Sequence, residues 1–353
     1  MNNKEKSIAN YKSMTLRKAW IILFLIIGLG GVILWGMSVG GSSLGLDKVF
    51  QAIGDFFTGN ETVTEAEKYI ALGIRVPRVI AGMVAGASLA LSGLLMQGIF
   101  QNPLVSPYTL GISNAASFGA CLAIISCTGM AAIVVQPILT PVLSFVFSVG
   151  AMLLVFLIAK FGGQSTKTLV LTGVAIGYLF ASLVSLIKYL VHTDALPDLV
   201  YWQMGSVANT QWHEVYIMLG TFAACFVLSL FLAWDLNVMT LGKEEASALG
   251  VNFKRIQTIT FIMTTVLTGV TVAFTGVIGF VGLVAPHITR MIVGNDYRYC
   301  VPVSALFGGV LLLAADTLAK IVIAPTELPV GIITSLVGVP FYLFLVLRRN
   351  KNV

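Results

Sequence analysis

Charged residues are scarce in this sequence. Asp, Glu, Lys and Arg make up only 10% of its 353 residues, whereas hydrophobic residues make up 57%. Soluble globular proteins carry about 25% charged residues, so a soluble fold is excluded. The apolar runs approach the ~20 residues that a helix needs to cross a bilayer. They far exceed the ~10-residue alternating strands of a membrane barrel. The composition therefore predicts an all-α, polytopic integral membrane protein.

Patterns of catalytic and metal-binding residues are absent as well. The stretch nearest to a nucleotide-binding loop, residues 163–168, has Thr166 where that motif needs Gly before Lys. The four cysteines lack metal-site spacing and are expected to be buried apolar side chains. The three histidines, His192, His213 and His287, are interpreted as structural. We therefore expect no catalytic residue, no metal site and no cofactor.

Apolar runs between charged or turn-rich breaks predict ten transmembrane helices. They cover residues 20–39, 76–100, 108–128, 131–159, 168–190, 214–234, 256–275, 277–294, 301–323 and 331–347. The boundary between the seventh and eighth runs is the least marked, because Thr275–Gly282 is apolar and rich in Gly. If those two runs were one span, the count would be nine and the termini would lie on opposite sides.

The charge distribution favours ten spans with a cytoplasmic N-terminus. In that arrangement 15 of the 21 Lys and Arg residues lie on the inner side, with only 5 of the 15 acidic residues. This is the positive-inside pattern. It predicts a multi-pass protein of the cell membrane with both termini cytoplasmic. The domains would be a cytoplasmic segment 1–19, a transmembrane domain 20–347 and a tail 348–353. The net positive charge of the chain is explained by this membrane topology, so no nucleic acid partner is expected.

One polar segment interrupts the apolar runs. In Leu241–Arg255, LGKEEASALGVNFKR, two glycines bracket a good helix-forming stretch with two glutamates in its first turn. A basic piece, Asn252–Arg255, follows. The segment reads either as an ordinary connecting loop or as cytoplasmic helices that dock a soluble partner.

Acidic residues deep in the spans are few. Asp316 and Glu327 lie near the outer ends of their runs and Asp235 lies at the inner boundary. Ion-coupled transporters usually need carboxylates inside the bundle, so this scarcity disfavours ion coupling. Residues 86–93 align weakly with 269–276 in the opposite membrane direction. Such an inverted repeat is typical of transporter folds and leaves a secondary transporter as an alternative. An intramembrane enzyme is a remote third possibility, because no catalytic pair is present.

Seven motifs in order resemble the permease subunits of binding-protein-dependent ABC importers for ferric siderophores, haem and vitamin B12, the FecCD-type family. The resemblance runs from about residue 40 to the C-terminus. The motifs are RVPR (75–78), GASLALSGLLMQGIFQNPLVSPYTLGIS (86–113), LTGVAIG (171–177), YWQMGS (201–206), LGKEEASALGV (241–251), GFVGLVAPHITR (279–290) and ELPVGIITSLVGVPFYLFLV (327–346).

The resemblance implies a vitamin B12-importer-permease-like fold and a set of partners. These are two copies of an ABC ATPase subunit, a second permease subunit (the same chain or a paralogue), an extracytoplasmic binding protein and the lipid bilayer. The ATPase would hydrolyse ATP, so this chain would not be an enzyme. Ferric siderophore is the expected cargo, with haem or vitamin B12 as alternatives.

The resemblance also implies site residues. ATPase coupling would involve Leu241, Gly242, Glu244, Glu245, Ala248, Leu249 and Gly250. Docking of the binding protein would involve Arg75, Arg78 and Lys320, although Lys320 stands where some relatives have Arg. The alternative is that the two arginines snorkel to the lipid headgroups. Docking is favoured, because both depart from the inside bias of the other Lys and Arg residues. The cytoplasmic gate would be Ser165 and Thr166. The path would be lined by Gly173, Gly177, Gly331, Ser335 and Gly338.

Overall fold

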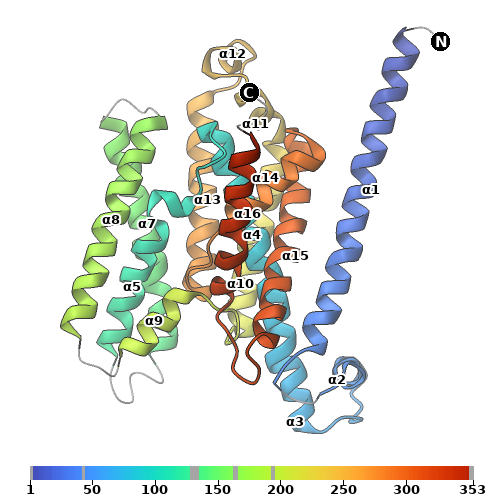
Figure 1. The fold of residues 1–353 in the computed structure, drawn as a ribbon, viewed down its shortest axis with the longest axis vertical. Helices are drawn as coiled ribbons and strands as arrows, with labels where there is room; N and C mark the ends of the chain where they lie inside the picture. Colours follow the sequence, from blue (N-terminus) through green and yellow to red (C-terminus); the bar gives the residue numbers. More distant parts are fainter. Residues whose placement is uncertain (1–2, 42–43, 128–134, 162–165, 192–194, 350–353) are drawn as a thin grey trace.

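The computed structural model describes residues 3–41, 44–127, 135–161, 166–191 and 195–349 (Figure 1). Within these ranges the regular structure is entirely helical. The first half contains α1 (Asn3–Ser38), α2 (Leu46–Thr58), α3 (Glu65–Lys68), the π-helix η1 (Tyr69–Arg75), α4 (Val76–Phe100), the 3-10 turn η2 (Pro107–Leu110), α5 (Ile112–Ser126) and α7 (Gln136–Phe161). The second half contains α8 (Thr166–Leu190), α9 (Leu196–Met204), α10 (Trp212–Phe231), α11 (Ala233–Met239), α12 (Lys243–Ala248), α13 (Phe253–Thr275), α14 (Val281–Val293), α15 (Tyr297–Ile321) and α16 (Val330–Arg349).

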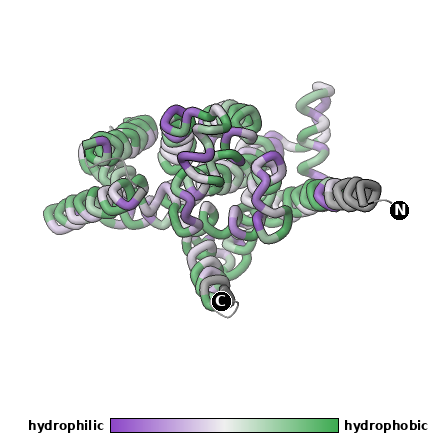
Figure 2. Tube along the Cα trace, turned by 90° about the horizontal axis from the view of Figure 1, so that it is seen from above, coloured by the Kyte–Doolittle hydropathy of each residue, from purple (hydrophilic) through white to green (hydrophobic). Residues whose placement is uncertain are grey.

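The molecule has two ends, named here after the elements that mark them. At the α12 end lie α12, the beginning of α1 and the end of α16 (Figure 1). At the α2 end lie α2 and α3. Viewed from above, most helical turns are hydrophobic, and hydrophilic residues gather in the central connections (Figure 2). This is the distribution expected when lipid surrounds the helices and water reaches the two ends.

Seven helices are long and apolar enough to cross a membrane, and three shorter apolar helices accompany them among the described residues. The shorter ones are Ile112–Ser126, Val281–Val293 and Val330–Phe344. Together they overlap the ten predicted runs one for one. The uncertain seventh boundary coincides with an interruption, since α13 ends at Thr275 and α14 begins at Val281. The prediction of an all-α membrane protein is confirmed, whereas the number of spans remains a prediction.

α4 is the central helix of the bundle. It packs against α10, α13, α14 and α15. In the most apolar 18-residue stretch of the continuous helix Glu65–Phe100, 89% is buried inside the protein. Small residues allow these close contacts: a Cβ at Gly86 would overlap the backbone of Gly308 in α15, and one at Gly93 would overlap that of Gly282 in α14. In membranes, where lipid is as apolar as the helices, such close backbone packing is a main source of helix association.

The helix that contains the second predicted span is longer than the predicted residues 76–100. Helical backbone runs without a break from Glu65 to Phe100, through η1 and α4. Pro77, in the first turn of α4, lacks an N–H and would clash with the carbonyl of an ordinary preceding α-turn. The π-turns of η1 widen the helix just before it, and the Val76 N–H bonds to the carbonyl of Ala71. The chain therefore reaches α4 without a sharp kink.

α1 also differs in extent from the segment predicted before the first span. It begins at Asn3, so most of residues 1–19 are helical and continuous with the first predicted span. α1 leans mainly on α15. On the opposite side of the bundle, α5, α7, α8 and α9 form a group that contacts the central helices chiefly through α13 (Figure 1).

Candidate functional site

The polar segment predicted to couple the protein to a partner projects from the α12 end (Figure 1). Residues 243–248 form α12, and only Ala246 is buried. Leu241 and Leu249, which flank the helix, are 59% and 53% exposed. Two exposed leucines on a segment outside the apolar runs offer apolar surface that contact with another protein would bury. Glu244, Glu245, Ala248 and Gly250 are exposed beside them.

Glycines fix the shape of this segment. Gly242 precedes α12 with φ of 121° and Gly250 follows it with φ of 83°, a region of backbone space that other residues rarely adopt. Ala246 is completely buried, and its carbonyl accepts a 2.9 Å hydrogen bond from the Val251 N–H. Asn252 then caps α13 by accepting from the Arg255 N–H. The predicted pair of coupling helices is therefore one short helix and the first turn of α13.

α11, which leads into α12, is fastened to the start of α15. The Asn237 Nδ2 donates to Asp296 Oδ1 at 2.9 Å, and the Tyr297 N–H donates to Asn237 Oδ1 at 2.8 Å. Arg298 pairs with Asp296 at 2.7 Å. The hydrogen bond from the Arg298 side chain is the largest cause that lowers the pKa of Asp296 to about 2; partial burial opposes it, and Asn237 adds to it.

A buried charge cluster lies at the α2 end. The Arg78 guanidinium donates to both oxygens of Asp316, at 2.9 and 3.0 Å, and to Glu327 at 2.6 Å. The Lys320 ammonium lies 3.2 Å from the Asp316 carboxylate. Arg78, Asp316 and Lys320 are only 6%, 1% and 8% exposed. Two of the three predicted docking cations thus have their counter-charges inside this chain.

The third predicted docking cation, Arg75, is also directed inward. It is 6% exposed, and its Nη1 donates to the carbonyls of Met37 and Leu44 at 2.7 and 2.8 Å. It thereby joins η1 to the end of α1 and the start of the α2 region. Backbone carbonyls in this connection accept the hydrogen bonds of its Nη1.

The glycines predicted to line the path lie on packed faces of their helices. In α8, a Cβ at Gly173 would lie 2.8 Å from the Leu110 Cα, and one at Gly177 would lie 3.2 Å from the Gly111 Cα. Asn114 Nδ2 also donates to the Gly177 carbonyl at 3.0 Å. These glycines therefore allow η2 and α5 to approach α8. The open face of α8 is formed by larger side chains, among them Leu171, Val174, Tyr178 and Leu179.

α16 repeats this arrangement. A Cβ at Gly331 would overlap the carbonyl of Met204, and one at Gly338 would lie against the Phe280 side chain. Ser335 is half-buried beside Gly279. The predicted gate cannot be placed as fully: Ser165 lies outside the described residues, and Thr166 begins α8.

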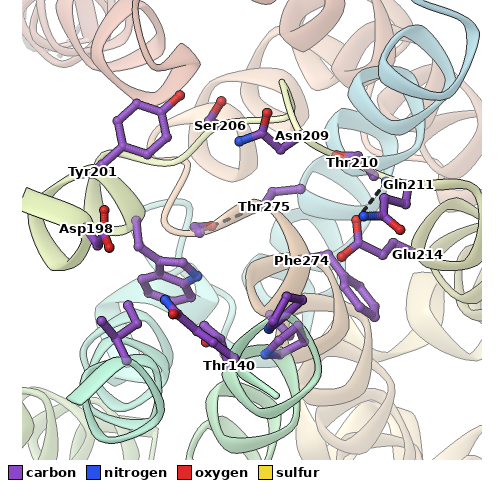
Figure 3. A pocket seen from close by; sticks show the side chains of 17 residues that line it. Thr140, Asp198, Tyr201, Ser206, Asn209, Thr210, Gln211, Glu214, Phe274 and Thr275 are labelled. Atoms are coloured by element: carbon purple, nitrogen blue, oxygen red, sulfur yellow. Dashed lines mark hydrogen bonds between the residues drawn. The ribbon is translucent and has the colours of Figure 1, made fainter. Parts of the chain in front are cut away.

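A polar cavity of about 460 Å³ opens near the α2 end, between α7, α9, α10 and α13 (Figure 3). Asp198 and Glu214 lie on opposite sides of it, with Asn209 and Thr275 between them and Tyr201 on the side of Asp198 (Figure 3). The Gln211 N–H donates to Glu214 at 2.9 Å. Among the described residues, the lining of this cavity includes two carboxylates and no Lys or Arg. We call it the α9 cavity.

A second polar cavity, of about 620 Å³, lies near the α12 end. Its walls include Gln97, Asn102, His287, Arg290 and Asn295. The first four of these residues lie within the sequence motifs given above, but no role beyond structure or topology was expected of them. The sequence feature that could have indicated this cavity is the presence of polar residues at the ends of two apolar runs. Only the fold shows that these two ends meet.

Comparison with known proteins agrees with this architecture. The model of the FecCD transport family matches residues 23–348. The haemin transport system permease protein of Yersinia pestis is 38% identical over 302 residues, which cover 83% of this chain and 87% of that protein. The cobalamin import system permease protein of Halobacterium salinarum is 40% identical over 289 residues, covering 82% and 76%.

A solved structure shows the same fold. It is described as an inward-facing conformation of a transporter assigned to the metal-chelate type of ABC transporters. It superposes with a TM-score of 0.80 and 31% identity, covering 94% of this chain and 99% of that one. From the match to the family model, the sequence identities and this superposition, the chain belongs to the FecCD transport family.

Proposed function

We propose that this chain forms the membrane path for a ferric siderophore, delivered by an extracytoplasmic binding protein and driven by a separate ATPase. Membership of the family makes it a permease of an ABC importer for metal chelates. The cargo names of the two relatives, haemin and cobalamin, are both metal chelates. Among the chelates that this family carries, the sequence resemblance favours a ferric siderophore.

The observation that carries the proposed ATPase contact is the exposure of α12 with its flanking leucines. A permease whose described residues include no nucleotide-binding loop needs an external source of energy, and α12 offers a surface through which a partner could move the bundle. We propose that the α12 end is cytoplasmic, in keeping with the positive-inside pattern. Two ATPase copies would act on two permease subunits, with the open faces of α8 and α16 turned toward the path between them.

Ion coupling has less support from the geometry. Asp316, the most deeply buried carboxylate among the described residues, is held by Arg78 and Lys320. A carboxylate that accepts from two cations is poorly suited to bind and release a driving ion in each cycle. We therefore propose no secondary transport.

The ATPase contact is tested by charge reversal on α12. The Glu244→Lys, Glu245→Lys double variant should retain much less of the ATPase subunit on purification, because four units of charge change on an exposed helix. The matched control is Glu61→Lys, Glu65→Lys, which makes the same change at the α2 end. An undiminished ATPase and normal uptake in the α12 variant would contradict the proposed contact.

The cargo is tested in the reconstituted complex of permease, ATPase and binding protein. We expect a ferric siderophore to stimulate ATP hydrolysis, and haemin and cobalamin to have little effect. Stimulation by haemin or cobalamin alone would overturn the siderophore assignment and leave the importer function in place.

Docking of the binding protein at the α2 end remains a prediction. The three cations predicted to take part already have partners within this chain. Arg78 could pair with a partner carboxylate only in competition with Glu327, whose side chain is 33% exposed. Glu327→Gln should therefore strengthen binding of the purified binding protein several-fold if Arg78 docks directly. Glu61→Gln, which removes an exposed charge away from Arg78, is the control. Equal affinities would show that Arg78 supports the surface without touching the partner.

A further inference from the structure

The cavity near the α12 end, which we call the α12-end cavity, lies where two sequence motifs meet. Gln97 and Asn102 come from the end of α4 and the connection after it, and His287 and Arg290 come from α14. Thr240, two residues before Gly242, also lines the cavity. The cavity therefore adjoins the polypeptide that leads into α12.

The chemistry of this cavity is one-sided. Its lining contains the Arg290 guanidinium and several amide groups, and no Asp or Glu among the described residues. Asp296, which follows Asn295 in sequence, is engaged by Arg298 and Asn237. The α9 cavity at the other end has the opposite character: its described lining residues include two carboxylates and no Lys or Arg. The α12-end cavity thus favours a ligand that accepts hydrogen bonds and carries negative charge.

One wall of the cavity contains a hydrogen-bond donor that lacks a partner. Gln97 is 3% exposed, and its Oε1 accepts from Arg290 Nη1. Because a guanidinium only donates, this contact identifies the other amide atom of Gln97 as the nitrogen. Among the described residues that nitrogen has no hydrogen-bond partner. A buried amide N–H without a partner is unfavourable, so a hydrogen-bond acceptor placed beside it would be stabilised.

The walls are also tied to the element before α12. Gln101 Nε2 donates to the Met239 carbonyl at the end of α11, at 2.6 Å. On the other side, Asn237 of α11 is bonded to Asp296 and to the Tyr297 N–H. Arg290 reaches back to α4, where it contacts Gln97 and donates to the Leu94 carbonyl at 3.4 Å. A group bound to Arg290 and Gln97 would therefore hold α4 and α14 together, beside α11.

We propose that the α12-end cavity receives a carboxylate side chain of the ATPase subunit, as a second contact beside α12. This inference rests on the proposed function. The carboxylate accepts from Arg290 and from the unpartnered amide of Gln97. Its charge is complementary to the cavity, and its position is reached by a partner already seated on the exposed leucines of α12. The ATPase then acts on α4 and α14 directly, and not through α12 alone.

An isosteric charge change tests the electrostatics. Asn295 is exposed at the cavity wall, so Asn295→Asp adds a negative charge without altering size or the buried Gln97–Arg290 contact. We expect about tenfold weaker association with the purified ATPase subunit, because a like charge opposes the incoming carboxylate. Asn295→Lys should bind as tightly as wild type or more tightly. Asn60→Asp at the α2 end is the control. Wild-type affinity in Asn295→Asp would overturn the proposal.

Site-specific photo-crosslinking separates this proposal from the proposed function. A photoreactive residue replaces Met291, a 58% exposed residue of the cavity lining, or Glu244 on α12. Capture of the purified ATPase subunit from both positions supports the cavity contact. Capture from Glu244 alone overturns the cavity contact and leaves the importer function standing. Capture from neither position contradicts the proposed function itself.

Inorganic phosphate tests the alternative that the α12-end cavity binds a free anion in place of a carboxylate of the ATPase subunit. If phosphate binds to the purified chain, and Asn295→Asp weakens that binding but not ATPase association, the cavity holds a free anion. That result would overturn the assignment to a partner carboxylate.

Discussion

Asp316 is the residue on which the charge cluster at the α2 end depends. It accepts from Arg78 and neutralises Lys320, and all three side chains are buried. A cluster of two cations and two carboxylates, one of them partly exposed, has no net charge, which makes its burial at a span end tolerable. Removing the central carboxylate would leave two cations with only Glu327 to balance them.

Asp316→Asn should therefore be strongly destabilising, by about 3–5 kcal/mol, because it leaves buried charge uncompensated. Glu327→Gln should cost much less, since its side chain is 33% exposed and water can replace it. The measurement is the thermal unfolding midpoint of each purified variant in detergent. Equal midpoints for the two variants would contradict the central position of Asp316.

The contribution of Asp296 to the stability of the folded chain should depend on pH. Its pKa is lowered from 3.8 to about 2 in the folded chain, chiefly by Arg298. A carboxyl with a lowered folded-state pKa contributes stability that is complete above its unfolded pKa and is lost as the pH falls through the folded pKa. Asp296 thus stabilises the protein fully above about pH 4.

Asp296→Asn should lower thermal stability at pH 7, and its difference from wild type should shrink between pH 4 and pH 2. Asn can still cap α15 and accept from Asn237, so the variant isolates the charge. Melting curves of both proteins at pH 7 and pH 3 measure the effect. A difference that stays constant with pH would show that the Arg298 pair contributes nothing.

At the scale of elements, close helix contacts depend on glycines whose faces are fully occupied. Gly93 of α4 meets the backbone of Gly282 at the start of α14. Neither backbone can yield locally, so an added methyl group must separate the two helices. Gly220 in α10, in contrast, has no heavy atom within 4 Å of a Cβ built on it.

Gly93→Ala should destabilise the protein by about 1–3 kcal/mol, the usual cost of overpacking. Gly220→Ala should be neutral or stabilising, because Ala is the better helix former by about 1 kcal/mol. Thermal unfolding in detergent compares the two. If the two variants have the same thermal unfolding midpoint, then α4 and α14 are not in the contact described.

At the scale of the molecule, the two ends differ in what they present. The α12 end carries exposed leucines and a donor-rich cavity, whereas the α2 end carries the α9 cavity and its two carboxylates. This asymmetry matches a protein that meets different partners on the two sides of a membrane.

Cysteine labelling tests which end faces outward. On a background without the four native cysteines, single cysteines at Asn60 and Asn209 should react with an impermeant reagent in intact cells. A cysteine at Ser247 on α12 should react only after the membrane is opened. All three positions are exposed, so accessibility to the reagent differs only by side. Labelling of position 247 in intact cells would reverse the proposed orientation.

The sequence by itself determined the class of the protein and the placement of its apolar helices, because the hydropathy of a 20-residue run is a local property. It likewise located α12, since two glycines and a run of helix formers define that helix without help from neighbours. The interruption after Thr275 was left open, because Gly and apolar residues suit both a turn and a span.

Tertiary structure decided where the polar and small residues of those helices point. Arg78 meets Asp316 from 238 positions away, and no local pattern indicates whether a cation at a span end turns to a partner or to its own chain. Gly173 and Gly331, which the resemblance implies as path lining, also lie at close helix contacts. Their packing was not foreseen, because a helix that is apolar on every side does not reveal its buried face. The same reason hid the α12-end cavity: its donors come from α4 and α14, and only the packing of those two helices brings them together.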